Sequence, residues 1–350
     1  MSGNAIKSAI VGFGLSGRVF HAPFIHHSSQ FDLKTIAQRT SDSSNAEYPY
    51  VEAVYSLQEI LDDETIELVV VATPNETHFE MALRVLKAGK HLVIEKPFAV
   101  NVEETRELIN LAESNHLNLF VFHNRRWDGD FLTVQKIIEQ KLLGEIVEYE
   151  VHYNRFKPEL NPKPWKEIKG PGSGILYDLG THIIDQAVCL FGRPNSVTAH
   201  LFKQRAQTKI DDSFDVILEY ASLKVSLKST LLAREEGPRY IIRGRNGSFV
   251  KSGIDPQEDD MVAGISPLSE NWGIDNKENW GLLNTRLKGL QFQGKVETLR
   301  GNYWGFYENI YAVMRESGRI AIPPSSAQTT TEIIESAIAS HQFGTKIILE

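Results

Sequence analysis

The fold is decided by residues 6–17, which read IKSAIV followed by GFGLSG. The first six residues are mostly apolar and rich in β-branched side chains, a composition typical of a buried strand. The next six are glycine-rich and open a segment of helical character, so the stretch predicts a strand that turns tightly into a helix. A strand, a glycine-rich turn and a helix in this order begin a βαβ unit, which builds a parallel sheet.

The rest of the first 122 residues repeats this alternation of strand and helix. One intervening stretch, Thr77–Ala88, is amphipathic and ends before Gly89, as expected for a helix packed on a sheet. Four further short runs have a β-type composition: Phe31–Ala37, Leu68–Ala72, His91–Ile94 and Asn118–Phe122. We therefore predict an α/β protein that begins with a Rossmann domain, a doubly wound parallel sheet, over residues 1–123.

The regular alternation of predicted strands and helices ends after Arg126. The pattern predicts a helix at 131–141, a strand at 145–153, a proline- and glycine-rich loop at 157–174 and a helix at 177–191. Several β-type segments then follow without long helices between them: Phe214–Tyr220, Lys224–Ser229 and Tyr240–Arg243. We predict a second α/β domain over residues 124–350 with an open, largely antiparallel sheet. The polar, glycine-rich residues 255–300 predict no element, whereas Ser325–His341 predicts a closing helix.

Composition and charge narrow the possible partners. The 350 residues carry a formal net charge of -8 and no basic block, which argues against nucleic acid or an anionic membrane and favours a small molecule. The single cysteine, Cys189, excludes an intrachain disulfide and fits a reducing compartment. The sequence shows neither a signal peptide nor an apolar run of about 20 residues that would span a membrane. We expect a cytoplasmic protein.

The glycine-rich turn has the spacing of a dinucleotide fingerprint. Its three glycines allow a tight turn, a close approach of backbone to pyrophosphate and close packing of helix on strand. Free N–H groups at the start of the helix attract phosphate. Glycine-rich turns also join strands to helices without any ligand, but the βαβ context favours a cofactor site. We predict cofactor contacts from Gly12, Phe13, Gly14, Leu15 and Gly17.

The end of the second strand bears on the choice between NAD and NADP. An acidic residue about 20 positions past the fingerprint would bind the ribose 2′-hydroxyl of NAD. This chain instead has Arg39, followed by Thr40 and Ser41, and a guanidinium suits a 2′-phosphate. Arg39 could also be an ordinary solvated arginine, and Asp42 could reach back to the ribose. We predict NADP rather than NAD.

The third predicted strand, Leu68–Ala72, leads into another candidate cofactor segment. The carboxyl edge of an open α/β sheet is where ligands bind, and this strand ends there. We predict that Thr73, Pro74 and Asn75 contact the cofactor, and we expect His78 to begin the following helix rather than to bind a ligand.

A lysine follows the strand His91–Ile94 directly, in Glu95-Lys96-Pro97. Pro97 biases Lys96 toward extended backbone, so the lysine side chain projects from a defined point at the end of a buried strand. The tripeptide alone could equally be an ordinary charged strand end. With the fingerprint and the βαβ order around it, we predict that Lys96 is catalytic and that Glu95 and Lys96 lie beside the cofactor. Lys96 can donate a hydrogen bond to a substrate oxygen and stabilise developing negative charge.

A second pair of reactive residues lies on the helix expected at 177–191. Asp178 and His182 are four residues apart, so they share one face of a helix. Oxidation of a secondary alcohol by hydride transfer also removes the hydroxyl proton, which a histidine can accept. We predict that His182 transfers this proton and that Asp178 orients the imidazole or binds a substrate hydroxyl. The pair could instead be purely structural, which is the role we expect for Asp185.

Polar and aromatic residues crowd two further places, 123–128 and 153–156, which follow predicted strands. Both could line a polyol pocket, with Asn124 and Arg155 as substrate contacts, or both could form an interdomain hinge. A zinc site is a further option, built from Asp178, His182, His123 and His152. The sequence has no His-x-x-x-His or Cys-x-x-Cys spacing, so we predict that no metal is bound.

Several longer sequence motifs resemble those of one known protein family. The fingerprint, Glu95-Lys96-Pro97 and the stretch from Gly172 to His182 resemble the glucose–fructose oxidoreductase/inositol dehydrogenase (Gfo/Idh/MocA) family, and the match runs nearly end to end. The chain looks closest to the branch of NADP-dependent scyllo-inositol dehydrogenases, through residues 17–23, 123–128, 130–133, 177–180 and 182–186. The resemblance implies a Rossmann domain followed by an α/β domain whose sheet supports a homodimer or homotetramer. It assigns catalysis to Lys96, Asp178 and His182.

The expected activity is transfer of a hydride between NADP and a secondary hydroxyl or ketone of a cyclitol or sugar, with scyllo-inositol and scyllo-inosose as the first candidates. A rival enzyme on the same fold retains its NAD(P) and uses it in glycoside cleavage or in oxidoreduction between two sugars. A non-enzymatic rival senses the dinucleotide and would be expected to lack the catalytic lysine, so Lys96 and His182 argue against it.

Overall fold

A computed structural model describes residues 5–39, 43–163 and 167–349 of the chain. The chain divides into two compact units. Each unit is discontinuous in sequence, and the predicted division after residue 123 stays a prediction. Unit 1 comprises Met1–Asn124, Gln257–Trp272 and Tyr303–Gln328; unit 2 comprises Arg125–Pro256, Gly273–Asn302 and Thr329–Glu350.

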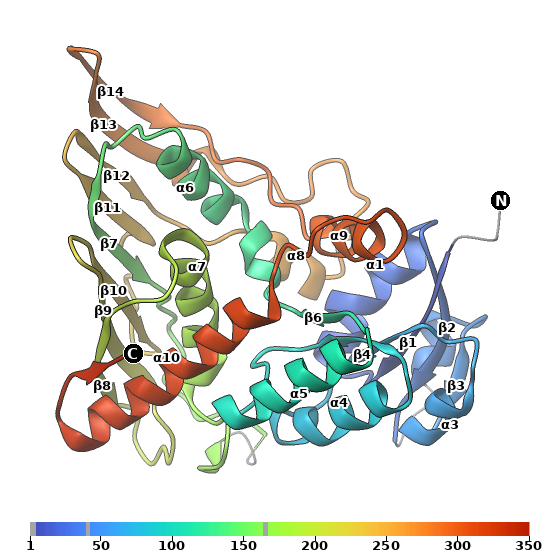
Figure 1. The fold of residues 1–350 in the computed structure, drawn as a ribbon. Coiled ribbons are helices and arrows are strands. Elements are labelled where there is room, and N and C mark those ends of the chain that lie inside the picture. Colours follow the sequence, from blue (N-terminus) through green and yellow to red (C-terminus); the bar gives the residue numbers. More distant parts are fainter. Residues whose placement is uncertain (1–4, 40–42, 164–166, 350) are drawn as a thin grey trace. The chain divides into compact units, whose positions relative to one another are not determined.

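Unit 1 is built on a six-stranded parallel sheet (Figure 1). The strand order is β3-β2-β1-β4-β5-β6, which is the order of a doubly wound dinucleotide-binding fold. The predicted Rossmann sheet is confirmed, and only the short β3 was not predicted. The strands are β1 (Ile6–Val11), β2 (Phe31–Ala37), β3 (Glu52–Val54), β4 (Leu68–Val71), β5 (His91–Ile94) and β6 (Leu119–Val121).

Helices lie on both faces of this sheet, with α4 and α5 on one face and α1 and α9 on the other (Figure 1). Because both faces are covered, all four residues of β4 are buried. No helix in the described part of the chain is both long and apolar enough to cross a membrane. The helices of unit 1 are α1 (Ala22–His27), α2 (Ser43–Glu47), α3 (Leu57–Asp62), α4 (His78–Lys87), α5 (Val102–Ser114), α8 (Gln257–Val262) and α9 (Trp304–Arg315), with a π-helical segment η1 (Ser16–His21) and a 3-10 turn η2 (Asn75–Thr77).

An aromatic cluster joins the late segments of unit 1 to its first 124 residues. The ring of Tyr307 on α9 stacks on Phe24 of α1 with 5.9 Å between ring centroids, and its edge meets Phe31 of β2 at 5.5 Å. Phe306 packs edge-on against Phe122 at 4.8 Å. Part of the core of this Rossmann unit is therefore supplied by residues close to the end of the chain.

Unit 2 contains a nine-stranded mixed sheet in the order β14-β13-β12-β11-β7-β10-β9-β8-β15 (Figure 1). Neighbouring strands are antiparallel except for the parallel pair β7 and β10, so the predicted largely antiparallel sheet is confirmed. Residues 255–300, for which the sequence predicts no element, contain α8 of unit 1 and the hairpin of β13 and β14. The strands are β7 (Ile146–His152), β8 (Ser196–Phe202), β9 (Ser213–Glu219), β10 (Lys224–Thr230), β11 (Tyr240–Gly244), β12 (Gly247–Lys251), β13 (Gly281–Leu287), β14 (Leu290–Val296) and β15 (Ile347–Ile348).

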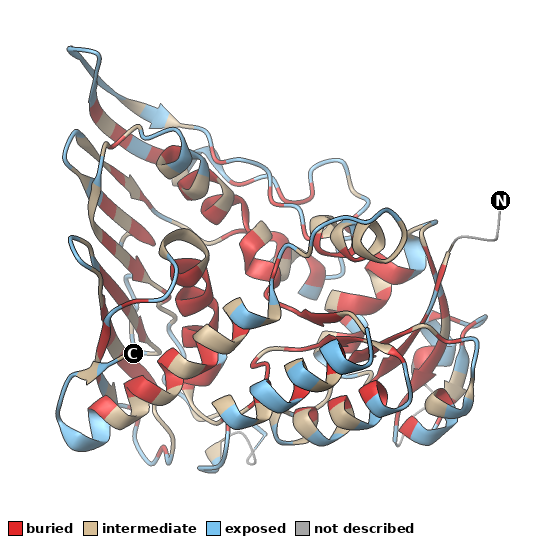
Figure 2. Ribbon diagram, in the orientation of Figure 1, coloured by how far each residue is buried: buried red, intermediate tan, exposed pale blue. Residues whose placement is uncertain are grey.

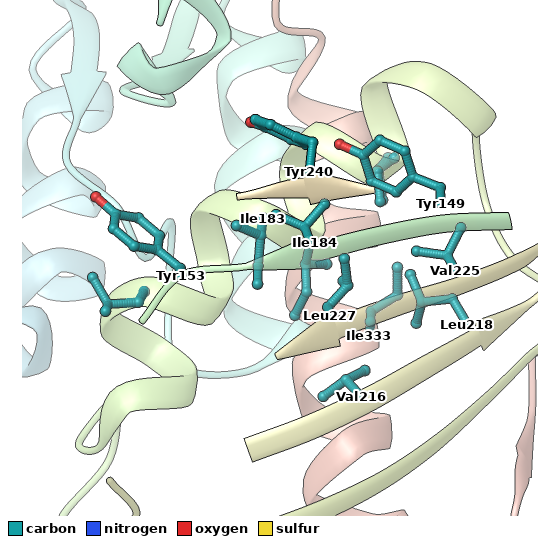
Figure 3. Close-up of a cluster of buried hydrophobic side chains, with 14 of the residues drawn as sticks. Tyr149, Tyr153, Ile183, Ile184, Val216, Leu218, Val225, Leu227, Tyr240 and Ile333 are labelled. Atoms are coloured by element: carbon teal, nitrogen blue, oxygen red, sulfur yellow. The ribbon is translucent and has the colours of Figure 1, made fainter. Parts of the chain in front are cut away.

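The core of unit 2 lies where helices pack on this sheet, and buried residues concentrate there (Figure 2). The helices are α6 (Gly129–Glu139), α7 (Thr181–Phe191) and α10 (Pro324–Phe343), of which α10 belongs to unit 2 from Thr329 onward. Along β9 alternate residues are buried, because successive side chains of a strand point to opposite faces. Figure 3 shows these strand residues beside helix residues in one apolar cluster, which includes Ile183, Ile184, Val216, Leu218, Val225, Leu227 and Ile333. Each such side chain stabilises the fold by roughly 1.5–3 kcal/mol through burial.

Candidate active site

The glycine-rich turn after β1 has the geometry that a dinucleotide fingerprint requires. Gly12 has a φ of +98°, and a Cβ at this position would collide with the carbonyl oxygen of Ala72. A Cβ at Gly17 would collide with the carbonyl oxygen of Gly12, so the fold itself requires glycine at both positions. A Cβ at Gly14 would meet no atom within 4 Å. The absent side chain of Gly14 therefore leaves an open stretch of backbone, which is what close approach of a pyrophosphate needs.

This turn lies at the carboxyl edge of the sheet, where the strand order reverses between β1 and β4. Ligands of open α/β sheets bind at such a reversal. The predicted contacts Thr73, Pro74 and Asn75 follow β4 at the same edge. Of the two non-glycine residues predicted in the turn, Phe13 meets the ring of Tyr48 edge-on at 6.1 Å, and Leu15 is 57% exposed.

The structure describes the segment after β2 as far as Arg39, the residue predicted to contact a 2′-phosphate. Arg39 is exposed, whereas Gln38 is buried and its Nε2 donates a hydrogen bond to the Oγ of Ser44 at 2.6 Å. Neither residue is a carboxylate. The hydroxyl neighbours Thr40 and Ser41 and the alternative acid Asp42 lie outside the described residues.

Glu95 and Lys96 follow β5 at the same carboxyl edge. Glu95 is 8% exposed and Lys96 is half-buried. The Glu95 Oε2 accepts a hydrogen bond from the main-chain N–H of Lys96 at 2.9 Å, and its Oε1 accepts from the hydroxyl of Ser16 and lies 3.1 Å from the Nε2 of His21. Burial would raise the pKa of Glu95, but the hydrogen bonds from His21 and Ser16 and the charge of Lys96 act against it and lower that pKa. Glu95 is thus a buried carboxylate that connects the first turn to the lysine.

Two residues of this cluster, His21 and Tyr307, are absent from the sequence predictions. His21 is fully buried at the end of η1, and its Nδ1 lies 2.6 Å from the hydroxyl of Tyr307. His21 lies one turn after Gly17, within the string 17–23 that carries the family resemblance, but that string assigned it no role. No local signal exists for Tyr307, because 286 positions separate it from His21 and only the return of α9 brings the two together.

A second buried histidine, His78, connects two loops of the same edge. As expected, it is the first residue of α4. Its Nδ1 lies 2.9 Å from the carbonyl oxygen of Pro97, and its Nε2 lies 2.9 Å from that of Thr73. Burial lowers the pKa of His78, although hydrogen bonding to the two carbonyls opposes the shift. His78 therefore ties the segment after β4 to the segment after Lys96.

In unit 2, Asp178 and His182 lie on consecutive helical segments. The predicted single helix at 177–191 is a π-helical turn, η5 (Leu176–Gly180), that continues into α7 at Thr181. Asp178 is exposed, whereas His182 is 6% exposed. The exposed carboxylate is therefore placed to meet a solute, and the imidazole is largely withdrawn from solvent.

The start of this helical stretch is held by a half-buried carboxylate, Asp211. Its Oδ2 accepts a hydrogen bond from the main-chain N–H of Leu176 at 2.9 Å, and burial raises its pKa. Gly174 has a φ of +96°, and a Cβ at this position would overlap the Asp211 carboxyl group. The glycine-rich break before Asp178 thus allows Asp211 to approach the helix start.

The remaining candidate residues have defined local partners. Asn124 is 7% exposed and begins the 3-10 turn η3 (Asn124–Trp127). The Arg155 guanidinium is half-buried, lies 5.4 Å from the ring centroid of Tyr153 and donates to its hydroxyl at 3.4 Å. Asp185 pairs in a bidentate manner with Arg126, at 2.7 and 2.8 Å, and both side chains are buried. A buried pair of this kind holds α7 in place.

Comparison with known proteins identifies the family. Residues 6–123 match the NAD-binding Rossmann fold of the GFO_IDH_MocA oxidoreductase family, and residues 135–349 match the C-terminal alpha/beta domain of the same family. The chain belongs to the Gfo/Idh/MocA family. It is an NAD(P)-binding oxidoreductase, and the resemblance predicted from the motifs is confirmed.

Several Gfo/Idh/MocA relatives match this chain over nearly its whole length. It is 38% identical over 347 residues to scyllo-inositol 2-dehydrogenase (NADP(+)) IolW of Bacillus subtilis (strain 168), a match that covers 99% of this chain and 97% of IolW. It is 40% identical over 341 residues to the oxidoreductase YdgJ of Escherichia coli (strain K12), covering 97% of each chain. The solved structure of YvaA from Bacillus subtilis matches with a TM-score of 0.96 at 38% identity, covering 99% of each chain.

The candidate residues of this Gfo/Idh/MocA chain fall into two groups. Unit 1 brings the glycine turn, residues 73–75 and Glu95-Lys96 to one edge of its sheet, and unit 2 carries Asp178 and His182 on adjoining helical turns. The joint action of Lys96 with Asp178 and His182 stays a prediction, as do the substrate contacts of Asn124 and Arg155. Within the described ranges, no group of three or more His, Cys, Asp or Glu side chains is arranged to hold a metal ion.

Proposed function

We propose that the protein is an NADP-dependent enzyme that interconverts a secondary hydroxyl and a ketone of a cyclitol or sugar, with scyllo-inositol and scyllo-inosose as the first substrates to test. The observation that carries the proposal is the 38% identity over 99% of the chain to scyllo-inositol 2-dehydrogenase (NADP(+)) IolW. A half-buried lysine at the carboxyl edge of the dinucleotide-binding sheet also favours an enzyme over a protein that only senses the cofactor.

The residues of unit 1 fit a dinucleotide cofactor. The open backbone at Gly14 would receive the pyrophosphate, while Gly12 and Gly17 allow the turn to pack against the sheet. Arg39 would pair with a 2′-phosphate, because it is exposed and no carboxylate follows β2 directly. When bound, the nicotinamide ring supplies the carbon that accepts or returns the hydride.

We assign the chemistry at the substrate oxygen to Lys96 and His182. In the oxidative direction the substrate carbon loses a hydride, the hydroxyl proton passes to the imidazole of His182, and the C–O single bond becomes a carbonyl. The ammonium group of Lys96 donates a hydrogen bond to the same oxygen and stabilises its developing negative charge. Asp178, Asn124 and Arg155 bind the remaining hydroxyl groups of the polyol in this proposal.

A panel of cyclitols and sugars followed by NADPH absorbance, with NAD as the comparison cofactor, tests the activity. We expect NADP-linked turnover of scyllo-inositol or scyllo-inosose. Lys96→Ala should lower kcat/KM by about 10²-fold or more, because it removes a donor aimed at the developing charge. Absence of NADP-linked turnover with every polyol would sink the proposed activity, and an unaffected Lys96→Ala variant would sink the role of the lysine.

We also propose that the protein forms a homodimer or homotetramer through the sheet of unit 2. Large apolar side chains are exposed on one face of the hairpin of β13 and β14: Leu287 is 37%, Leu290 75% and Phe292 47% exposed. Exposed apolar side chains that gather on a sheet are typical of a protein interface. Light scattering should give at least twice the 39.5 kDa mass of one chain, and a monomer at micromolar concentration would contradict the proposal.

A further inference from the structure

A chain of hydrogen bonds runs through unit 1 from α9 to the main chain of Lys96. The hydroxyl of Tyr307 lies 2.6 Å from the Nδ1 of His21, and the Nε2 of His21 lies 3.1 Å from the Oε1 of Glu95. The Oε2 of Glu95 accepts from the N–H of Lys96 at 2.9 Å, and Ser16 donates its hydroxyl to Oε1. Both carboxylate oxygens of Glu95 are thereby held.

The chemistry of the groups sets the direction of these bonds. An ionised carboxylate can only accept, so the Nε2 of His21 is the donor toward Glu95. A neutral imidazole protonated at Nε2 carries a lone pair at Nδ1, which accepts the proton of the Tyr307 hydroxyl. Burial raises the pKa of Tyr307 well above its ordinary value, so this hydroxyl keeps its proton. Each bond in the series then has one donor and one acceptor.

The side chains of this series are enclosed by the core of unit 1. His21 is 0%, Tyr307 1% and Glu95 8% exposed. The His21 ring packs on Phe122 with 4.2 Å between centroids, and the Tyr307 ring stacks on Phe24. Hydrogen bonds in such a water-poor setting are strong and leave the groups little freedom, so a fully satisfied network of this kind rigidifies its surroundings.

We propose that Tyr307 and His21 are positioning residues for Lys96. They orient the Glu95 carboxylate, the carboxylate holds the main chain of Lys96, and the main chain sets where the ammonium group stands relative to the substrate oxygen. The inference rests on the proposed function, since it takes Lys96 as the group that contacts the substrate. Through Tyr307, helix α9 would then affect catalysis as well as completing the core of unit 1.

Tyr307→Phe tests this proposal, because it removes one hydroxyl and keeps the ring. Tyr311→Phe is the matched control: it makes the same change one turn along α9, where Tyr311 also meets Phe31 but lies outside the series. We expect Tyr307→Phe to lower kcat about tenfold, since small misplacement of a catalytic group is costly, while KM and the Kd for NADPH stay within about twofold. The control should keep wild-type kcat. Equal kcat in both variants, or a Tyr307→Phe defect confined to KM or to thermal unfolding, overturns the proposal.

A spectroscopic measurement tests the positioning without turnover. Lysine amines in the full-length protein are labelled by reductive ¹³C-methylation, and the NMR signal of Lys96 is assigned as the one missing from Lys96→Arg. We expect Tyr307→Phe to shift or broaden that signal while the signal of Lys90, at the other end of β5, stays in place. An unmoved Lys96 signal overturns the inference, whereas a moved signal in a protein that turns over no polyol overturns only the proposed function. Should Tyr307→Phe fail to fold, Ser16→Ala perturbs the same carboxylate from a less buried position and is held to the same outcomes.

Discussion

The three glycines of the first turn meet different local demands, and substitution should separate them. Gly14→Ala places a methyl group where no atom lies within 4 Å, so the free energy of unfolding should stay within about 0.5 kcal/mol of wild type. The same methyl group obstructs the backbone surface that a pyrophosphate approaches, so NADPH binding should weaken roughly tenfold or more. Denaturant unfolding and titration of NADPH fluorescence measure the two effects.

Gly12→Ala is the contrasting variant at this turn. Its positive φ and its contact with Ala72 predict a loss of stability of about 1–3 kcal/mol before any cofactor is added. A Gly14→Ala protein that binds NADPH as tightly as wild type would show that the open backbone at residue 14 is not the pyrophosphate site.

Arg39 is the residue on which the preference for NADP over NAD depends in our proposal. Arg39→Asp should shift the ratio of kcat/KM values for NADP and NAD toward NAD by roughly 10²-fold, because a carboxylate repels the 2′-phosphate and accepts a hydrogen bond from a free 2′-hydroxyl. Arg84→Asp makes the same charge change at an exposed position on α4 and should leave the ratio unchanged. An unaltered preference in Arg39→Asp refutes the argument from this position.

Candidate catalytic residues could be predicted where a few neighbouring residues form a recognisable motif. Lys96 stands next to a proline at the end of an apolar strand, and Asp178 and His182 keep a helical spacing, so each is visible without a structure. The sequence around His21 and Tyr307 is that of ordinary core residues. Their hydrogen-bond partners lie far away in the sequence, so the sequence does not show these contacts. The sequence therefore indicates candidate reactive groups more readily than their distant contacts.

At the scale of elements, the junction of β5 and β6 contains a histidine whose protonation opposes folding. The Nδ1 of His91 accepts a hydrogen bond from the N–H of Asn118 at 2.9 Å. Burial lowers the pKa of His91 and the charge of Arg315 acts in the same direction, while Glu67 opposes them. Because the folded pKa lies below the unfolded value near 6.5, the unfolded chain binds more protons between the two values. The contribution of His91 to stability is thus complete above about pH 6.5 and is lost as the pH falls below it.

His91→Asn isolates this contribution, since the asparagine oxygen can still accept from Asn118 but does not titrate. We expect the free energy of unfolding to fall less steeply in the variant than in wild type between about pH 7 and about pH 5. The residual slope includes His27 and His78, whose pKa values are also lowered by burial, and carboxylates with lowered pKa values such as Glu95 and Glu148. Urea unfolding at several pH values measures the difference. If the free energy of unfolding changes with pH equally in the two proteins, His91 does not contribute to the pH dependence of stability.

Elements were predictable where the pattern is long enough to show a period. Strands β4 and β5 are apolar runs because both sheet faces are covered, whereas β1 and β2 begin with polar residues between apolar ones and become apolar toward their ends. Strand β3 has three residues, one of them exposed Glu52, so it carries no pattern and was missed. The π-helical segments η1 and η5 look α-helical in sequence, since the change in period over five or six residues is too small to read.

At the scale of the whole molecule, the course of the chain through unit 1 was the hardest feature to predict. Residues 257–272 and 303–328 belong to unit 1 although more than a hundred residues separate them from its first segment. Their aromatic side chains could as well have served a core of their own, because composition does not state which partner a tryptophan or tyrosine will find. Only long-range contacts, such as that of Tyr307 with Phe24, decide the matter.

A fragment that ends at residue 124 tests whether the first segment can form the Rossmann unit by itself. Without α9, the buried rings of Phe24, Phe31 and Phe122 lose the aromatic partners that this helix supplies, and exposing three such side chains costs roughly 5–9 kcal/mol. That loss is comparable to the entire stability of an average domain, about 5–15 kcal/mol. We therefore expect the fragment to bind a hydrophobic dye and to unfold without a cooperative transition by circular dichroism, and co-expression with residues 257–328 to restore cooperativity. The contrary result is cooperative unfolding of the fragment alone, with NADPH bound at wild-type affinity. It would show that residues 1–123 are an autonomous domain and that residues 257–272 and 303–328 are not needed for its folding.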